Sequence, residues 1–150
     1  MRPTKPFHEA SESTQAWWSC PGLLYFLGVG QPTIAVKIGM LAITPKTNLR
    51  SAMVRRLASI QSSNHELVYV LGVVIREEGL HPTKDTEDHE RELHREFEHL
   101  ARFTANSRGA EWFSAAPELL ERIRAISQSP LQAGVPETVG SLLIRGASDA

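Results

Sequence analysis

The sequence predicts a small α/β domain in which helices pack against an antiparallel sheet. Its hydrophobic patterns run in the order strand, strand, helix, strand, helix, helix. The first two strands follow each other so closely that an antiparallel hairpin is the simplest connection between them. With 150 residues, 41% of them hydrophobic, the chain is long enough to enclose one core. We therefore expect a single domain.

The chain divides into three expected segments. Residues 1–19 are polar and are expected to form a loosely ordered N-terminal arm, with Trp17 and Trp18 anchoring its end. Residues 20–127 contain the strand and helix patterns and are expected to form the domain. Residues 128–150 are rich in Gly, Pro and Ser and are expected to form a C-terminal tail, in which the apolar residues 142–144 could dock.

Strands are expected where short apolar runs lie between turn residues. The hairpin strands are predicted at 23–27 and 34–38. The run 67–75 is rich in β-branched residues and almost continuously hydrophobic, which is typical of a central strand covered on both faces. Residues 111–113 are expected to form a short extended segment.

Helices are expected where apolar residues recur every three or four positions. The first predicted helix begins near residue 49, and the second, strongly charged, spans 85–102. A third begins at Pro117, because proline is favoured at the first helical position. The three apolar stripes are Leu49, Met53, Leu57 and Ile60; Leu93, Phe97, Leu100 and Ala101; and Leu119, Leu120, Ile123 and Ile126.

Several classes of protein are excluded by composition. The single cysteine, Cys20, excludes an internal disulfide framework and every multi-cysteine zinc motif. The longest apolar run, 22–30, is about half of the roughly 20 residues that a transmembrane helix needs. The first residues lack the apolar stretch of a secretory signal. A cytoplasmic location without membrane contact is therefore expected.

The charges are distributed unevenly, although the formal net charge is only −1. Residues 13–65 contain five cations and no acid, whereas residues 66–98 contain ten acids and four bases. Such a chain can present a cationic face to phosphate groups while staying near neutral overall. The same asymmetry also fits charges that compensate one another across the fold.

Two ionisable residues occupy helix positions beside apolar stripes. Glu90 lies on the apolar side of its predicted helix together with His94, and Arg56 borders the stripe of the first helix, whereas Arg55 points to solvent. A carboxylate in such a place must be paired, protonated or bound to a cation. Two interpretations stay open: a structural Arg56–Glu90 ion pair with His94 at the edge of the core, or a functional site.

Five short motifs occur in order between residues 22 and 126. They are Leu23-Leu24-Tyr25, Lys37-Ile38-Gly39, Arg56-Leu57 followed by Ile60-Gln61, Glu90-x-x-Leu93-His94-x-x-Phe97, and Glu111-Trp112-Phe113. Together they resemble the GIY-YIG nuclease superfamily. More narrowly, they are similar to its branch related to the meiotically up-regulated gene family, common in phage and bacterial proteins, whose second motif reads KIG. Here Leu23-Leu24 replaces the Gly-Ile of the first motif.

The resemblance implies a GIY-YIG-like fold with a three-stranded antiparallel sheet flanked by helices. It implies a divalent-metal-dependent endonuclease that hydrolyses nucleic-acid phosphodiester bonds, with DNA expected as the substrate. Glu90 would ligate Mg²⁺ (or Mn²⁺), and Arg56 would neutralise the phosphate oxygens. Tyr25 would position or deprotonate the attacking water. Lys37 would activate Tyr25 or act as the base, and His94 would orient the metal shell or shuttle a proton.

Other positions carry less specific expectations. The segment between Gly39 and Arg56 is longer than in typical members of the family, so Arg50 is an alternative for the arginine role. Lys46, Arg50 and Arg55 are expected to bind the nucleic-acid backbone. The Glu111-Trp112-Phe113 motif is expected to be structural.

Two other functions are compatible with the sequence. A catalytically weak or inactive nucleic-acid-binding module on the same fold would use the cationic segment alone. A protein-interaction domain would use the apolar segment around Leu142 and would keep Arg56 and Glu90 as an ion pair. Because the arm and the tail are short, sequence specificity is expected to be weak or to come from a partner protein.

Overall fold

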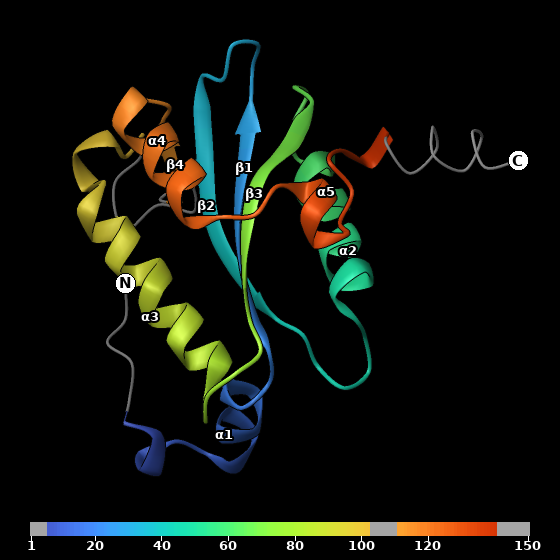
Figure 1. Cartoon of the computed structure of the whole chain (residues 1–150), viewed down its shortest axis with the longest axis vertical. Coiled ribbons are helices and arrows are strands. Elements are labelled where there is room, and N and C mark those ends of the chain that lie inside the picture. The colour runs from blue at the N-terminus through green and yellow to red at the C-terminus, as the bar shows by residue number, and fades with distance from the viewer. Residues whose placement is uncertain (1–5, 103–110, 141–150) are drawn as a thin grey trace, which may run out of the picture.

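A sheet of four antiparallel strands in the order β3-β1-β2-β4 forms the centre of the fold. The computed structural model describes residues 6–102 and 111–140 (Figure 1). The strands are β1 (Gly22–Val29), β2 (Ala35–Ala42), β3 (Val68–Arg76) and β4 (Trp112–Ser114). The predicted α/β class, single domain and antiparallel sheet are confirmed. The predicted number of three strands is wrong, because Trp112–Ser114, which overlaps the extended segment expected at 111–113, forms a fourth strand.

The central strand is β1, not β3. All but one residue of β1 is buried, and β1 pairs along its length with both β2 and β3. The near-continuous hydrophobicity of β3 has another cause. Val68, Val70 and Val73 belong to the core on one face of the sheet, whereas Leu71 and Val74 pack on the other. A continuous apolar run therefore indicates that both faces of a strand are covered. A strand at the edge of the sheet can be covered on both faces as well as a central one.

The helices cover both faces of the sheet (Figure 1). Helix α2 (Leu49–Ser62) packs Met53 and Leu57 on the face that carries Leu23, Tyr25 and Leu27. Helices α3 (Pro82–Glu96) and α4 (Pro117–Ile126) cover the opposite face. No helix in the described parts of the chain is long and apolar enough to cross a membrane.

Two helix boundaries reflect local chemistry. The side chain of Asn48 caps α2 by accepting a hydrogen bond from Ser51 N at 2.9 Å. Helix α3 begins at Pro82, three residues before the predicted start, because proline is suited to the first turn. It ends at Glu96, and a 3-10 helix, η2 (Glu98–Leu100), follows where the helix was predicted to continue.

The N-terminal arm is more ordered than predicted. Residues 7–9 form a 3-10 helix, η1 (Phe7–Glu9), and α1 spans Glu12–Trp18. Ser11 caps α1 by accepting a hydrogen bond from Thr14 N. A serine at this position is a signal for a helix start, but it is hard to recognise in a segment that is polar throughout. Trp18 is buried and anchors the segment as expected, with the Lys84 ammonium over its ring.

The first part of the predicted tail belongs to the domain. The backbone of Gln128 forms two hydrogen bonds with Val73, and Val70 N donates to Glu137 O at 2.7 Å. Between these contacts lies the short helix α5 (Pro130–Ala133). This segment covers the outer edge of β3 mostly through backbone contacts, which composition alone does not reveal. The apolar residues 142–144 lie outside the described residues.

The role of this segment can be tested by side-chain truncation. Val135 is 2% exposed and belongs to the core, whereas Leu131 is 80% exposed. Val135→Ala should therefore lower the free energy of unfolding by about 2 kcal/mol, because it removes buried methyl groups. Leu131→Ala should change it by less than about 0.5 kcal/mol. Urea unfolding would measure both values, and equal effects would show that the segment is not part of the core.

Candidate functional site

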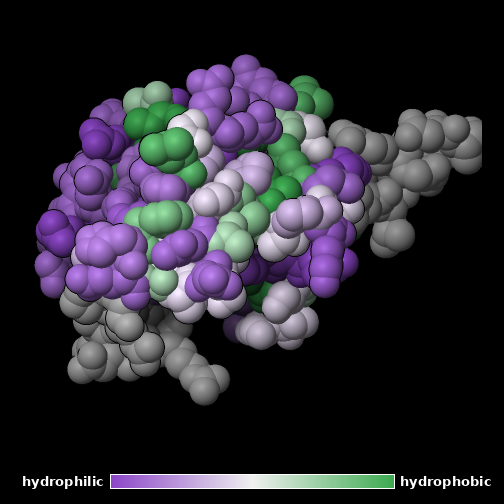
Figure 2. All heavy atoms as spheres, turned by 90° about the horizontal axis from the view of Figure 1, so that it is seen from below, coloured by the Kyte–Doolittle hydropathy of each residue, from purple (hydrophilic) through white to green (hydrophobic). Residues whose placement is uncertain are grey.

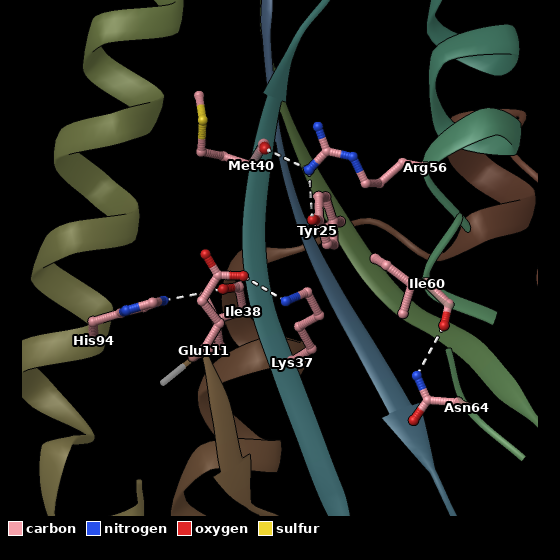
Figure 3. A network of polar contacts seen from close by, with 9 residues as sticks. All are labelled: Tyr25, Lys37, Ile38, Met40, Arg56, Ile60, Asn64, His94 and Glu111. Carbon is pink, nitrogen blue, oxygen red and sulfur yellow. Dashed lines mark hydrogen bonds and ion pairs between the residues drawn. The ribbon is translucent and has the colours of Figure 1, made fainter. Parts of the chain in front are cut away.

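The candidate site lies at the edge of β2 where β4 ends. Strand β4 pairs with β2 only over residues 35–37, and Glu111 O then accepts from Ile38 N at 3.0 Å. The next peptide group along this edge is used by α3, because His94 Nε2 donates to Ile38 O at 3.0 Å. Figure 3 shows the polar side chains of β1, β2, α2, α3 and Glu111 around this point.

Tyr25 and Arg56 form one half of the site. The Tyr25 ring lies across Gly39, its partner on β2, and a Cβ at position 39 would collide with that ring. Arg56 Nη1 donates to Tyr25 Oη at 3.0 Å and to Met40 O at 3.4 Å (Figure 3). The absence of a side chain at Gly39 therefore allows the hydroxyl of a buried strand residue to reach the arginine of α2.

Burial keeps the Tyr25 hydroxyl neutral. Desolvation raises the pKa of Tyr25 above 10.0, and the positive charge and hydrogen bond of Arg56 offset only part of this shift. Glu111 and Glu90 raise the pKa further. Tyr25 is therefore a phenol whose oxygen accepts from Arg56 and whose proton is available to another acceptor.

Lys37 and Glu111 form the second half of the site. Lys37 Nζ donates to Glu111 Oε2 at 2.5 Å, and the Lys37 side chain is only 13% exposed. The ammonium also lies 5.9 Å from the centre of the Trp112 ring. The motif that contains Glu111 predicts a structural role for it and gives no indication of its place in this network. The available signal for this contact is that Glu111 directly precedes a strand, and that the neighbouring strand carries the Lys37-Ile38-Gly39 motif.

Glu90 is a buried carboxylate on α3. It is 8% exposed, and its pKa is raised to about 8, first by burial and then by repulsion from Glu111 and Glu87. Lys37 and Arg56 attract it and lower the pKa in part. Within the described ranges, no ion pair or hydrogen bond joins the Glu90 carboxylate to another side chain.

The structural Arg56–Glu90 ion pair is therefore wrong. Arg56 comes from α2 on one face of the sheet, and Glu90 comes from α3 on the other. Their charges influence each other, but the Arg56 guanidinium is used by Tyr25 and Met40. A helical stripe shows which residues face the core, but not which face of a sheet the helix covers.

His94 lies one turn beyond Glu90 on α3. Its Nε2 carries the proton that is donated to Ile38 O, and its ring packs edge-on against Phe113 at 5.1 Å. Burial lowers the pKa of His94, although the hydrogen bond to Ile38 opposes this effect. The ring is therefore neutral, and Nδ1 is its remaining acceptor atom.

The other predicted cations lie outside this network. Arg50 Nη1 donates to Gly134 O at 3.3 Å, so the arginine beside Tyr25 is Arg56. Lys46 and Arg55 are exposed on the loop before α2 and on α2 itself. These three residues come from the cation-rich segment but do not contact the polar groups around Tyr25.

The donors present fit a hard divalent cation held mainly by water. No group of three or more His, Cys, Asp or Glu side chains suited to a metal occurs among the residues that the structure describes. Mg²⁺ commonly needs only one or two carboxylates and keeps several waters. Glu90 is such a carboxylate, and a bound cation would stabilise its ionised form. A zinc site of several protein ligands does not fit these residues.

The raised pKa of Glu90 predicts a pH-dependent cost in stability. Between its ordinary value of 4.5 and about 8, Glu90 is protonated in the folded chain and ionised in the unfolded chain. The stability that Glu90 contributes is therefore complete below 4.5 and is lost as the pH rises through about 8. Glu90→Gln should remove this loss and raise the free energy of unfolding at pH 8 by about 2 kcal/mol or more.

Urea unfolding at a series of pH values without divalent cations would measure this effect. Glu92→Gln is the matched control, since Glu92 is exposed on the same helix. The control should follow the wild-type pH profile. A Glu90→Gln profile parallel to that of the wild type would show that Glu90 ionises normally in the folded chain.

Comparison with known proteins adds no assignment to this geometry. No family model, no curated protein and no solved structure matches the chain. The resemblance to the GIY-YIG superfamily therefore rests on the five motifs in the sequence. The contacts around Tyr25, Lys37 and Glu90 supply an independent basis for a functional argument.

Proposed function

We propose that the chain is a divalent-metal-dependent endonuclease that hydrolyses phosphodiester bonds of nucleic acid, with DNA as the substrate to test first. The observation that carries this proposal is Glu90, a buried carboxylate without an ion pair among the described side chains, in the field of Lys37 and Arg56. A protein maintains such a group at a cost in stability. Binding a hard cation beside a phosphate would offset that cost.

The proposed reaction is attack of water on phosphorus. A bond forms between the water oxygen and phosphorus, one phosphorus–oxygen ester bond breaks, and the products are a phosphate monoester and a free hydroxyl. A Mg²⁺ or Mn²⁺ ion bound by Glu90 would supply charge stabilisation for the phosphate and the leaving oxygen. The remaining contributions come from side chains of this chain.

Each polar group in the network has a role that suits its protonation state. The Arg56 guanidinium would neutralise negative charge on the non-bridging oxygens, as such groups do in phosphoryl transfer. The Tyr25 hydroxyl is held by Arg56 and would orient the attacking water with its own proton. Neutral His94 would accept the proton of that water at Nδ1. The Lys37 ammonium would contact the substrate as a charged donor.

The cations outside the network fit the backbone of a longer substrate. Lys46 and Arg55 are exposed, and both come from the segment of residues 13–65 that contains no acid. Contacts of this kind give affinity that decreases with salt and do not select sequence. A partner protein would then supply specificity.

The protein-interaction alternative has less support than the nuclease. The exposed large hydrophobic residues in the described ranges are Ile34, Leu67, Leu80 and Leu131, which come from four separate parts of the chain. The surface shown in Figure 2 is largely hydrophilic, with hydrophobic residues in small groups. Among the described residues on this face, the distribution does not provide the broad apolar patch that marks an interaction surface. The apolar segment around Leu142 lies outside the described residues.

A nicking assay tests the proposed activity. The wild type should relax supercoiled plasmid with Mg²⁺ or Mn²⁺ and should not do so with EDTA. Glu90→Gln should lower the rate by at least about a thousandfold, because it removes the proposed metal ligand. Arg56→Lys should lower it by about a hundredfold, because an ammonium keeps the charge but not the paired N–H donors of the guanidinium. Glu92→Gln and Arg124→Lys are the matched controls and should keep the wild-type rate, because both residues are exposed and have no role in the proposed site.

The outcomes separate the candidate functions. Metal-dependent cleavage that Glu90→Gln abolishes supports the nuclease. Salt-sensitive plasmid binding without cleavage would favour the nucleic-acid-binding module. Neither cleavage nor binding of plasmid, branched DNA or RNA would contradict both functions.

Cation binding also has a readout that does not depend on cleavage. Mn²⁺ at millimolar concentration should raise the thermal unfolding midpoint of the wild type at pH 8, because the ion binds the folded chain through ionised Glu90. The same addition should leave the midpoint of Glu90→Gln unchanged. An equal shift in both proteins would place the cation elsewhere.

A further inference from the structure

The first residue of β4 and the residue before it hold the Lys37 side chain from two directions. Trp112 is the cross-strand partner of Lys37, and its ring lies 5.9 Å from the ammonium. Glu111, the preceding residue, accepts the ammonium hydrogen bond at 2.5 Å. Lysine side chains on strands normally keep considerable rotamer freedom. Here the ring of Trp112 and the carboxylate of Glu111, which are adjacent in sequence, restrict the rotamer freedom of Lys37.

The backbone of Glu111 is itself held beside β2. Glu111 O accepts from Ile38 N, so residue 111 is tied to the position next to Lys37. His94 binds the carbonyl of the same residue, Ile38. Figure 3 shows the Glu111 side chain between His94 on α3 and Lys37 on β2. One carboxylate therefore lies where the elements that carry Glu90, His94 and Lys37 meet.

Stability alone is a weak reason for this ion pair. The Glu111 side chain is 43% exposed, and exposed ion pairs contribute little to folding. The Lys37 ammonium is the less exposed partner, and it lies on the sheet face that carries Tyr25. The Lys37–Glu111 ion pair is therefore better suited to placing the Lys37 charge than to stabilising the fold.

We propose that Glu111 is a positioning residue that holds the Lys37 ammonium towards a phosphate oxygen of the substrate. This inference rests on the proposed function, since it assigns a role within the same site. Glu111 would not contact the substrate. It would act by restricting Lys37 to the rotamer in which the ammonium meets the phosphate.

The test is a double-mutant cycle that compares the wild type, Glu111→Gln, Lys37→Met and the variant carrying both substitutions. Glutamine keeps the size of Glu111 but removes its charge. Single-turnover cleavage of plasmid with Mg²⁺ gives the rate, and plasmid binding with Ca²⁺ gives the affinity. Glu118→Gln is the matched control, because Glu118 forms an exposed ion pair with His99 at 2.9 Å.

Glu111→Gln should lower the cleavage rate by about tenfold to a hundredfold, as expected for a misplaced charged donor. Its affinity for plasmid should change by less than about threefold, because binding depends on many phosphate contacts. In the Lys37→Met background, Glu111→Gln should have almost no further effect on the rate, since residues that act as a unit are not additive. Glu118→Gln should match the wild type.

A second readout does not require cleavage. The ammonium of an immobilised lysine gives a slowly exchanging signal in ¹⁵N nuclear magnetic resonance. The wild type should show such a signal that disappears in Lys37→Met, and Glu111→Gln should lose it while the thermal unfolding midpoint stays near that of the wild type. A signal from Lys84, which donates to Asp88 at 3.1 Å, should be unchanged in both variants.

The possible failures are distinguishable. If the wild type does not cleave nucleic acid, the proposed function is wrong and this inference falls with it. If the wild type cleaves and Glu111→Gln cleaves at the same rate, only the inference is wrong. Equal losses from Glu111→Gln with and without Lys37, or unfolding of Glu111→Gln, would show that Glu111 has a structural role.

Discussion

The short length of β4 is the constraint on which the candidate site depends. Strand β2 pairs with β1 over eight residues but with β4 over only three. At the point where β4 ends, the N–H of Ile38 donates to Glu111 and the carbonyl of Ile38 accepts from His94. A longer β4 would occupy this edge and exclude α3 from it. Because β4 stops, side chains from both faces of the sheet can meet around β2.

This arrangement makes ionisation of Glu90 unfavourable for the stability of the fold. Glu90 is desolvated and repelled by Glu111, and Lys37 and Arg56 offset only part of that cost. A hydrophobic residue would pack more favourably at such a position. Sites that bind ions commonly contain groups of this kind, because the unfavourable free energy of the empty state is recovered on binding. The electrostatics of Glu90 are therefore more readily explained by a ligand than by the fold.

The sequence predicted the elements better than it predicted their relations. Apolar periodicity located α2, and apolar runs between turn residues located the hairpin strands. Tyr25 and Arg56, which the motifs singled out, lie in contact in the structure. Periodicity could not show that Arg56 and Glu90 come from opposite faces of the sheet, because a helical stripe does not indicate which face of the sheet the helix covers. It also missed Glu111, whose contact with Lys37 joins residues 74 positions apart. The contribution of the segment after residue 127 was hidden because backbone groups make most of its contacts.

The uneven charge of the sequence has a structural explanation at this site. The acid-free segment supplies Lys37 and Arg56, and the acidic segment supplies Glu90. With Glu111, these four side chains have no net charge when Glu90 is ionised. In the proposed reaction, phosphorus passes through a state in which its oxygens carry about two negative charges, which a divalent cation balances. The water proton would move to His94, so the total charge of the site would stay the same while negative charge gathers on the phosphate oxygens. Lys37, Arg56 and the cation would lie beside those oxygens, so their attraction would strengthen towards the transition state, which is the condition for rate enhancement.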